Sequence, residues 1–303
     1  MVGKVLRVLE NLPDRAGVAV VRLRSLGDCV LTIPAIQVLK QSRPDLRIAI
    51  VVENRFAPIF EGNDSIEEIL PPAIPPLRSW RPQLCLNLHG GSRSAALTAA
   101  SGAQFRAGFA HFRFAHTYNV RIPRAQEVLG VDRVVHTAEH LASAMFFLGA
   151  RRIEIPRAHL HADRRSGAKP YAVIHPIASS PNKTWSADRF LAVAAKLEIE
   201  PVFIGGPEDD LSAFDAYRTL AGAPLAEIKD LLANATLFLG NDSGPAHMAA
   251  AFGLPVVVIF GASNVDVWRP WKTPAEALNS PDGIASISTG QVLEALARLR
   301  VHA

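Results

Sequence analysis

A turn rich in polar residues follows a buried apolar segment in the last quarter of the chain. Residues 236–239 are apolar or β-branched, and the next five, Gly240-Asn-Asp-Ser-Gly244, have turn composition before a helix expected over 246–252. Such a strand-to-helix turn offers free backbone N–H groups and the positive end of a helix dipole to an anion. The residues that could hold a phosphate and a ribose there are Asp242, Ser243, Gly244 and His247. An ordinary turn with a helix cap is the alternative.

A second polar loop follows an apolar strand expected over 171–174. It runs His175-Pro-Ile-Ala-Ser-Ser-Pro-Asn-Lys-Thr-Trp185 and leads to a helix expected over 187–198. Hydroxyl groups and backbone N–H groups can donate to diphosphate oxygens, and an ammonium group neutralises their charge. Ser179 and Lys183 are therefore candidate diphosphate ligands, although the same composition also suits a surface loop that carries one lysine.

Acidic residues follow the next strand, which is expected over 201–204. Glu208 and Asp210 could bind ribose hydroxyls, and they could equally stand in the first turn of a helix and complement its dipole. The residues alone leave both interpretations open.

A carboxylate also stands at a strand end in the N-terminal half. The run Arg22-Leu-Arg-Ser-Leu-Gly-Asp28 begins at the end of an apolar strand expected over 17–23, and its residues 24–28 are expected to form a turn before a helix over 30–42. It contains neither the GxGxxG dinucleotide fingerprint nor the Walker phosphate-binding pattern. Asp28 stands where a general base could act, since such a base needs reach to the substrate and a tuned pKa. A helix cap is the alternative.

Two histidines at helical spacing, His136 and His140, match part of a zinc-binding pattern. Zinc needs a third protein ligand in an accessible site, and this pair belongs to a peripheral helix expected over 136–149. We therefore expect exposed helix polars there and no metal. Cys29 and Cys85 form no CxxC pair, which is typical of reduced thiols in a cytoplasm.

The composition is that of a globular protein with a substantial core. The chain has 303 residues, 49% of them hydrophobic and 20% charged, and a formal net charge of +4. This charge is consistent with anionic ligands or an anionic membrane surface, and it is too small to indicate a nucleic-acid partner. No apolar run approaches the ~18 residues of a membrane span, and residues 1–15 carry charges throughout, unlike a signal peptide. We expect a cytoplasmic protein, soluble or at most peripheral on a membrane.

Strands and helices alternate in both halves of the chain, which predicts parallel sheets with crossover helices. The expected strands cover 17–23, 47–52, 84–88, 105–109, 171–174, 201–204, 236–239 and 256–260. A short amphipathic helix is expected within residues 1–16, the proline-rich segment 71–76 is expected to be a loop, and a last helix is expected over 289–301.

The alternation predicts two Rossmann-like domains. The N-terminal domain covers 1–155, a polar linker covers 156–169, and the C-terminal domain covers 170–303, with a last helix that is a candidate to pack back on the N-terminal domain. Ligands of open sheets bind outside the carboxyl ends of the strands. The cleft between the two domains is therefore the expected site.

The order of these motifs resembles glycosyltransferase family 9, the bacterial heptosyltransferases of lipopolysaccharide core assembly. The similarity extends from about Val18 to Trp271. Its most specific parts are residues 22–28 with Pro34-Ala35, then His175-Pro with Ser179, Lys183 and Trp185, and then residues 240–247. The resemblance implies an α/β GT-B fold, in which two Rossmann-like domains face each other across a cleft. The first domain would bind the acceptor and the second the nucleotide sugar.

The resemblance also implies a role for each candidate residue. Asp28 matches the family's proposed catalytic base, Lys183 the lysine at the donor phosphates, and Ser179 the small hydroxyl at the diphosphate. The donor loop is matched by Asp242, Ser243, Gly244 and His247, and the ribose-binding acid by Asp210 or Glu208. Arg93 and Arg106 lie where the family carries basic residues for the acceptor. The chain departs from the family pattern in an N-terminal extension of about sixteen residues, a short segment between Gly206 and Leu225, and Ala178.

These roles predict an inverting, metal-independent transfer of heptose from ADP-heptose to a lipopolysaccharide core or related lipid-linked acceptor, with no cofactor. Asp28 would deprotonate the acceptor hydroxyl, and Lys183 with the N–H groups at Ser243 and Gly244 would stabilise the leaving diphosphate. The alternatives are another nucleotide-sugar transferase or an epimerase on the same fold, and a nucleotide-sugar-binding protein without activity. The lipid-linked acceptor and the basic charge also predict peripheral membrane association.

Overall fold

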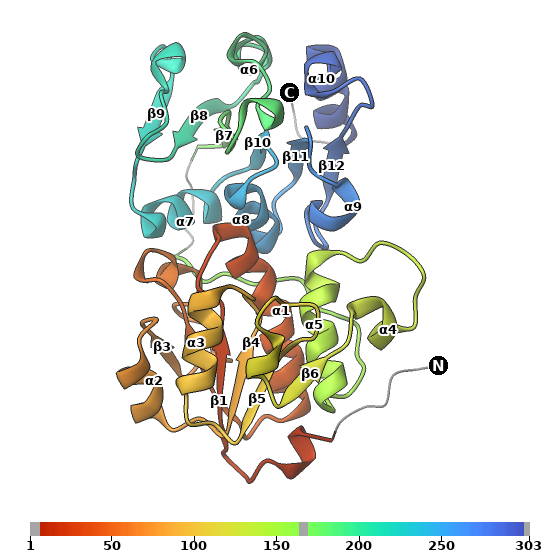
Figure 1. Ribbon diagram of the computed structural model, residues 1–303. Helices are drawn as coiled ribbons and strands as arrows, with labels where there is room; N and C mark the ends of the chain where they lie inside the picture. The colour runs from red at the N-terminus through yellow and green to blue at the C-terminus, as the bar shows by residue number, and fades with distance from the viewer. Residues whose placement is uncertain (1–6, 164–168, 300–303) are drawn as a thin grey trace. The chain divides into compact units, whose positions relative to one another are not determined.

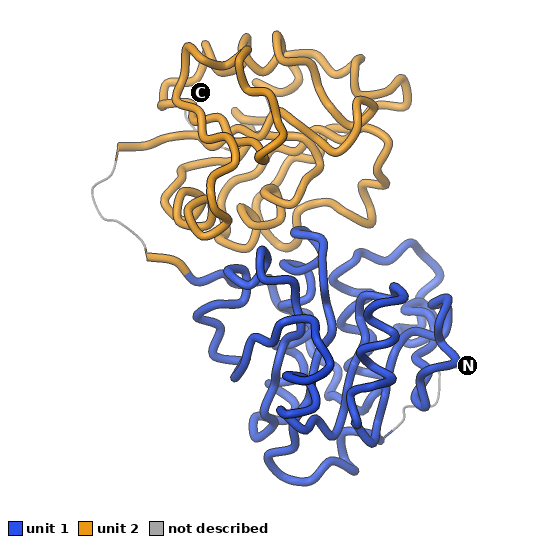
Figure 2. The backbone as a smooth tube through the Cα atoms, turned by 60° about the vertical axis from the view of Figure 1, so that its left-hand side comes forward, with its two compact units in different colours: residues 1–161 blue, residues 162–303 orange. Residues whose placement is uncertain are grey.

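The computed structural model describes residues 7–163 and 169–299, and the chain divides into two compact units (Figure 2). Unit 1 covers Met1–His161 and unit 2 covers Ala162–Ala303. The linker predicted over 156–169 includes this boundary, and its residues 164–168 lie outside the described residues. Within the described part of the chain, no helix is both long enough and apolar enough to cross a membrane.

Unit 1 is built on a six-stranded sheet in the order β3-β2-β1-β4-β5-β6, and every neighbouring pair is parallel (Figure 1). Its strands are β1 (Gly17–Val21), β2 (Arg47–Val51), β3 (Glu68–Leu70), β4 (Leu84–Asn87), β5 (Phe105–Phe109) and β6 (Val120–Ile122). Its helices are α1 (Leu26–Ser42), α2 (Ile74–Trp80), α3 (Ser92–Ala100), α4 (Ala125–Leu129) and α5 (Thr137–Leu148), with short 3₁₀ helices η1 (Leu9–Asn11), η2 (Asn54–Ile59) and η3 (Ala115–Thr117). Since β2 and β4 lie on opposite sides of β1, right-handed crossovers put α1 and α3 on opposite faces of the sheet.

Unit 2 is built on a second parallel sheet, in the order β12-β11-β10-β7-β8-β9 (Figure 1). Its strands are β7 (Tyr171–His175), β8 (Glu200–Gly205), β9 (Arg218–Ala221), β10 (Leu237–Asn241), β11 (Val256–Ile259) and β12 (Ala275–Leu278). Its helices are α6 (Ala187–Ala194), α7 (Leu225–Ala233), α8 (Gly244–Phe252), α9 (Val265–Trp268) and α10 (Thr289–Arg298), with η4 (Pro181–Lys183), η5 (Ser212–Phe214) and η6 (Ile284–Ser286). The last helix, α10, packs on α6, β11 and β12 of its own unit. Read from β9 to β12, this order is the same as that of unit 1 from β3 to β6, so β7 corresponds to β1 and β10 corresponds to β4.

The central strands of both sheets are apolar without interruption. Every residue of β1 and of β11 is buried, as expected of parallel strands that helices cover on both faces. The α/β fold with two Rossmann-like domains, predicted from the sequence, is confirmed by these two sheets. The prediction lacked four edge strands, β3, β6, β9 and β12, because each is short and contains residues that are not buried, so that its sequence shows no apolar run.

Two segments fold differently from the prediction. The proline-rich segment 71–76 is not all loop, because α2 begins at Ile74 and takes the next two prolines into its first turn, where a missing N–H costs no hydrogen bond. The turn expected after β1 is shorter than predicted, because α1 begins at Leu26 and brings Asp28 into its first turn.

The N-terminal segment forms the short helix η1 where a longer amphipathic helix is predicted, and residues 1–6 lie outside the described residues. In the described part of the segment, the side chains of Val8, Leu9 and Leu12 are buried. Hydrophobic contact, rather than helix length, therefore attaches this segment to unit 1.

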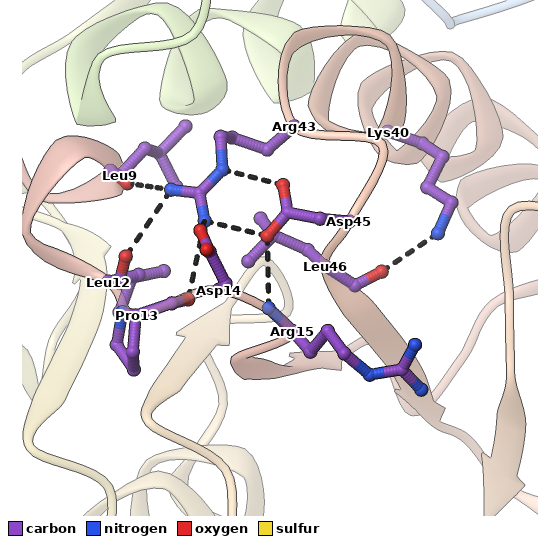
Figure 3. A network of polar contacts seen from close by, with 9 residues as sticks. All are labelled: Leu9, Leu12, Pro13, Asp14, Arg15, Lys40, Arg43, Asp45 and Leu46. Atoms are coloured by element: carbon purple, nitrogen blue, oxygen red, sulfur yellow. Dashed lines mark hydrogen bonds and ion pairs between the residues drawn. The ribbon is translucent and has the colours of Figure 1, made fainter.

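Arg43, the residue after α1, fastens the same segment by hydrogen bonds (Figure 3). Its guanidinium donates to the carbonyl oxygens of Leu9, Leu12 and Pro13. Asp45 accepts from Arg43 Nε at 2.7 Å and from the backbone N–H of Arg15 at 3.0 Å, and the Arg43 contact holds the pKa of the Asp45 carboxyl well below its usual range. The network stands at the opposite end of α1 from Asp28, roughly 20 Å along the helix axis, so it stabilises the fold and leaves the candidate base untouched.

Candidate active site

Asp28 stands in the first turn of α1, just after the carboxyl end of β1. Ser25 is the N-cap of this helix, and its hydroxyl donates to Asp28 Oδ2 at 3.0 Å. The Asp28 side chain is 25% exposed. One carboxylate oxygen is thus held by a local hydrogen bond while part of the group stays accessible to a ligand.

Arg22 faces the other oxygen of this carboxylate. Its Nη1 lies 3.5 Å from Asp28 Oδ1, and its Nε donates to the Thr32 hydroxyl at 3.2 Å. Thr32 in turn donates to the carbonyl oxygen of Asp28 at 2.8 Å. The Arg22 side chain is 6% exposed; burial lowers the pKa of its guanidinium, and the charge of Asp28 opposes that effect. Arginine stays protonated in such surroundings, so the carboxylate is oriented by a buried cation and a hydroxyl.

His89 is a residue of the same sheet edge that the sequence analysis does not name. It stands just beyond β4, and its Nδ1 lies 3.2 Å from the carbonyl oxygen of Arg24. Burial lowers the pKa of His89, and the charge of Arg22 adds to this effect. The buried Asn87 at the end of β4 accepts the N–H of His89 at 2.9 Å and thereby holds the loop. The signal that could have identified His89 is its position directly after an apolar strand, which it shares with the other candidates.

The two arginines assigned to the acceptor lie at different ends of the sheet. Arg93, in α3, is 60% exposed, and its Nη1 lies 3.8 Å from Oε1 of Glu53, a residue that follows the carboxyl end of β2. Arg106 pairs in register with Cys85 in the first half of β5, and its guanidinium donates to the carbonyl oxygen of Ala103 at 3.1 Å. The structure therefore brings Arg93 to the edge that carries the carboxylate, and it does not bring Arg106 there.

In unit 2, Ser243 is the N-cap of α8, directly after the carboxyl end of β10. Its hydroxyl makes no cap bond to the helix and lies 3.0 Å from Nδ1 of His175, the last residue of β7. The Ser243 side chain therefore does not occupy the first backbone N–H groups of α8, beginning with that of Gly244, and these groups can bind an anion. Burial lowers the pKa of His175 to about 4, so the imidazole is neutral near pH 7 and can both donate and accept.

Lys183 and Asp242 meet beside this helix N-terminus. Lys183 Nζ lies 4.0 Å from Asp242 Oδ2, and the two side chains are 31% and 11% exposed. The separation exceeds hydrogen-bond distance, so charge alone holds the pair. Burial raises the pKa of Asp242, although the Ser263 hydroxyl and the Lys183 ammonium both oppose the rise. The carboxylate keeps the ammonium near the start of α8, and the ammonium and this helix N-terminus form a surface suited to an anion.

Two further donor candidates lie close to these residues along the chain. Ser179 is exposed and lines a shallow hollow of about 480 Å³, formed by residues 178–181 and 184–187. His247, in the first turn of α8, is 5% exposed, and its ring meets Trp268 edge-on with 6.3 Å between the ring centroids. Ser179 is therefore accessible to a ligand, whereas the His247 side chain is buried and contacts Trp268.

The acids after β8 make local hydrogen bonds. Asp210 is exposed and accepts the N–H of Ser212 at 2.9 Å, which lowers the pKa of its carboxyl. Glu208 is also exposed. Asp209, which the sequence analysis does not name, accepts the N–H of Gly206 at 2.7 Å. Its charge partly opposes the effect of burial, which lowers the pKa of His175. Both predicted acids, Glu208 and Asp210, are therefore accessible, whereas Asp209 is the acid whose charge acts on His175 at the end of β7.

The histidine pair in α5 has structural contacts. His136 is 2% exposed, not an exposed polar residue as expected, and its Nδ1 caps the helix by accepting the N–H of Ala138 at 3.1 Å. His140 stacks on Phe109 with ring centroids 4.1 Å apart, and burial lowers its pKa to about 4. Over residues 7–163 and 169–299, no three histidine, cysteine, aspartate or glutamate side chains are grouped so as to hold a metal ion. Both cysteines are buried free thiols.

Comparison with known proteins decides the family. The family model described as glycosyltransferase family 9 (heptosyltransferase) matches residues 76–291, more than two thirds of the chain. The chain belongs to this family. The protein is thus a glycosyltransferase, and the predicted family and the predicted α/β fold with two Rossmann-like domains are confirmed.

Relatives of this glycosyltransferase cover most of its length. Lipopolysaccharide heptosyltransferase 3 of Escherichia coli is 28% identical in an alignment that covers 82% of this chain and 85% of the relative. The crystal structure of a family 9 glycosyl transferase from Veillonella parvula DSM 2008 superposes with a TM-score of 0.84 at 22% identity and covers 99% of both chains. The structure of E. coli heptosyltransferase WaaC with ADP-2-deoxy-2-fluoro heptose superposes with a TM-score of 0.73 at 18% identity, covering 93% of this chain and 99% of that chain. These two structures share the fold of the glycosyltransferase.

The two units of the glycosyltransferase present different functional groups at the carboxyl edges of their sheets. Unit 1 offers an oriented carboxylate that is suited to removing a proton. Unit 2 offers a lysine, a helix N-terminus and hydroxyl groups, which are suited to binding a phosphate group.

Proposed function

We propose that this glycosyltransferase moves a heptose from ADP-heptose to a lipopolysaccharide core or a related lipid-linked acceptor, with inversion at the anomeric carbon and without a metal ion. The observation that carries the proposal is the position of Lys183 beside Asp242 at the N-terminus of α8. The name of the E. coli relative and the ADP-heptose analogue in the WaaC structure support this donor and this class of acceptor.

In this proposal unit 2 binds the donor through its diphosphate. Lys183 and the first N–H groups of α8 contact the phosphate oxygens, and Ser179 and Ser243 donate hydroxyl hydrogen bonds. Negative charge develops on the ADP leaving group as the sugar–oxygen bond breaks. The same donors stabilise that charge, an electrostatic role that is worth about 3–4 kcal/mol per donor group in comparable sites. A lysine and a helix N-terminus supply the positive charge that a metal ion would otherwise provide.

Unit 1 binds the acceptor and supplies the base. Asp28 takes the proton of the acceptor hydroxyl while the hydroxyl oxygen forms its bond to the anomeric carbon, on the face opposite to the departing diphosphate. Arg22 and Ser25 orient the carboxylate through the contacts described above. Arg93 is the acceptor-binding arginine of the proposal because it lies at the same edge, whereas Arg106 does not.

Incubation of the purified protein with ADP-heptose and a core oligosaccharide that lacks its next heptose tests the proposal. Mass spectrometry should show addition of one heptose, NMR should show an anomeric configuration opposite to that of the donor, and EDTA should leave the rate unchanged. UDP-sugars serve as the comparison donors. Transfer from a UDP-sugar alone would contradict the donor, a change of the donor without any acceptor would indicate an epimerase, and donor binding without turnover on any acceptor would indicate a non-catalytic binding protein.

The lipid-linked acceptor and the net charge of +4 also support peripheral membrane association. The protein should sediment with vesicles that contain anionic phosphatidylglycerol and remain in the supernatant with pure phosphatidylcholine vesicles. Equal recovery in the two supernatants at low salt would exclude this part of the proposal.

A further inference from the structure

The loop that carries Lys183 is fastened at both ends by one buried side chain from a different strand. Asn241, the last residue of β10, is fully buried. Its Oδ1 accepts the backbone N–H of Trp185 at 3.0 Å, and its Nδ2 donates to the carbonyl oxygen of Pro176 at 2.7 Å. One amide group therefore satisfies a donor and an acceptor that stand on either side of the loop, and it does so one residue before Asp242.

The backbone in the middle of the loop packs closely against Gly261, which follows the end of β11. A Cβ atom on Gly261 would overlap the carbonyl oxygen of Asn182 and would lie 2.8 Å from the Cα of Lys183. The loop is also internally braced, since the Lys183 N–H and the Thr184 hydroxyl both donate to the carbonyl oxygen of Ser180 at 3.0 Å. The contacts of Asn241 at both ends of the loop and the close approach of Gly261 at its centre together fix the position of the loop relative to β10.

We propose that Asn241 is a positioning residue for donor binding, which fixes the Lys183 loop to the Asp242–Ser243 turn so that the ammonium and the N-terminus of α8 meet one diphosphate. The inference rests on the proposed function, because it assumes that the donor diphosphate binds at this edge. Gly261 contributes to the same positioning by admitting the backbone of the loop. Neither residue needs to touch the donor.

Unit 1 provides a matched contrast. Asn87 ends β4, the strand that corresponds to β10, and it is fully buried as well. Its Oδ1 accepts the N–H groups of His89 and Gly90 in its own loop, and its Nδ2 donates to the Ser94 and Tyr118 hydroxyls. The two asparagines are equally buried, and each is hydrogen-bonded through both its amide oxygen and its amide nitrogen. Of the two, only Asn241 spans a loop that follows another strand and carries a lysine.

A double-mutant cycle on ADP affinity, measured by calorimetry on the full chain, tests the inference. Asn241→Ala should weaken ADP binding by about tenfold, since two buried backbone groups lose their partner and release the loop. If Asn241 acts through the lysine, the same substitution should weaken binding by less than about twofold in a Lys183→Ala background. Gly261→Ala should behave in the same way, and it replaces Asn241→Ala in the double-mutant cycle if Asn241→Ala does not fold.

Asn87→Ala is the control for general destabilisation, and its ADP affinity should equal that of the wild type. The inference is wrong if the Asn241 or Gly261 effect is undiminished when Lys183 is absent, or if Asn87→Ala weakens ADP binding as much as Asn241→Ala. Failure of the wild type to bind ADP at all would be a different result, because it would overturn the proposed donor itself.

Discussion

Equivalent strands of the two units end in different ways. In unit 1, β1 passes into α1 after four residues, and the first turn of that helix holds a carboxylate against a buried arginine. In unit 2, β7 is followed by the longer segment 176–186, which carries a lysine to the N-terminus of a different helix. Equivalent edges of two sheets are thus adapted differently: one unit presents a negative side chain, and the other is suited to bind a negative ligand. This contrast predicts that substitutions in the two units affect different steps.

Asp28→Asn should have the largest effect. The amide keeps the shape of the carboxylate but cannot take a proton, so kcat should decrease by about 10²- to 10⁴-fold. ADP affinity, measured by calorimetry, should stay at the wild-type value because the substitution lies in unit 1. Weakened ADP binding would show that Asp28 belongs to the donor site and would remove the contrast between the units.

Lys183→Ala should both weaken ADP binding and lower kcat, by about 10²- to 10³-fold in kcat, because the ammonium neutralises charge that grows on the leaving group. Lys196→Ala, at an exposed lysine of the same unit, is the matched control and should have no effect. Steady-state kinetics with varied donor separate the two parameters. A change in the acceptor KM alone would contradict the assignment of Lys183 to the diphosphate.

Each unit contains a histidine whose pKa burial lowers to about 4, His140 in unit 1 and His175 in unit 2. Between about pH 6.5 and pH 4 the unfolded chain protonates these imidazoles while the folded chain does not, so stability should decrease as the pH falls through this window and should be independent of them above it. The loss is on the order of 1–3 kcal/mol for each histidine at pH 4. Urea unfolding at several pH values measures it, and His140→Phe, which keeps a ring against Phe109, should flatten the pH dependence.

The sequence predicts the sheets and the residues at their carboxyl edges because both depend on local pattern. Long apolar strands that are followed by polar turns identify β1, β7 and β10, and with them Asp28, Lys183 and Ser243. The sequence does not reveal that α1 begins at Leu26, because residues 24–28 have turn composition. The first N–H groups of a helix have no partner within it, so the polar residues typical of turns also suit a first helical turn.

Contacts between distant segments could not be predicted in this way. Nothing near Asn241 in the sequence indicates that its side chain holds a loop more than fifty residues earlier. Arg22 is similar, because the pattern places it beside Asp28 along the chain but does not reveal that it is buried and bonded to Thr32. Arg106 is a different case: the resemblance predicts a basic residue for the acceptor, but only the register of β5 shows which end of the sheet that residue occupies.

Arg22→Lys should have a smaller effect on the unit 1 site. Lysine keeps the charge near Asp28 but loses the planar fork that also donates to Thr32, and such geometry is not reproduced by an ammonium. We expect kcat to decrease by about tenfold, the equivalent of one charged hydrogen bond, with unchanged ADP affinity. Arg47→Lys, at an exposed ion pair with Glu67, is the control. An unaltered kcat would mean that Ser25 alone orients the carboxylate.

The smallest effect is expected at the acceptor arginines, and it distinguishes the two ends of one sheet. Arg93→Ala should raise the KM for the acceptor by about two- to fivefold, the range typical of an exposed charge pair, and should leave the donor KM unchanged. Arg106→Ala should leave both KM values unchanged, because its guanidinium is bonded to the Ala103 carbonyl oxygen near the amino end of β5; its cost should appear as a lower melting temperature. The reverse result would mean that the acceptor extends past the carboxyl edge, and the position of a residue along its strand would then no longer separate binding from folding.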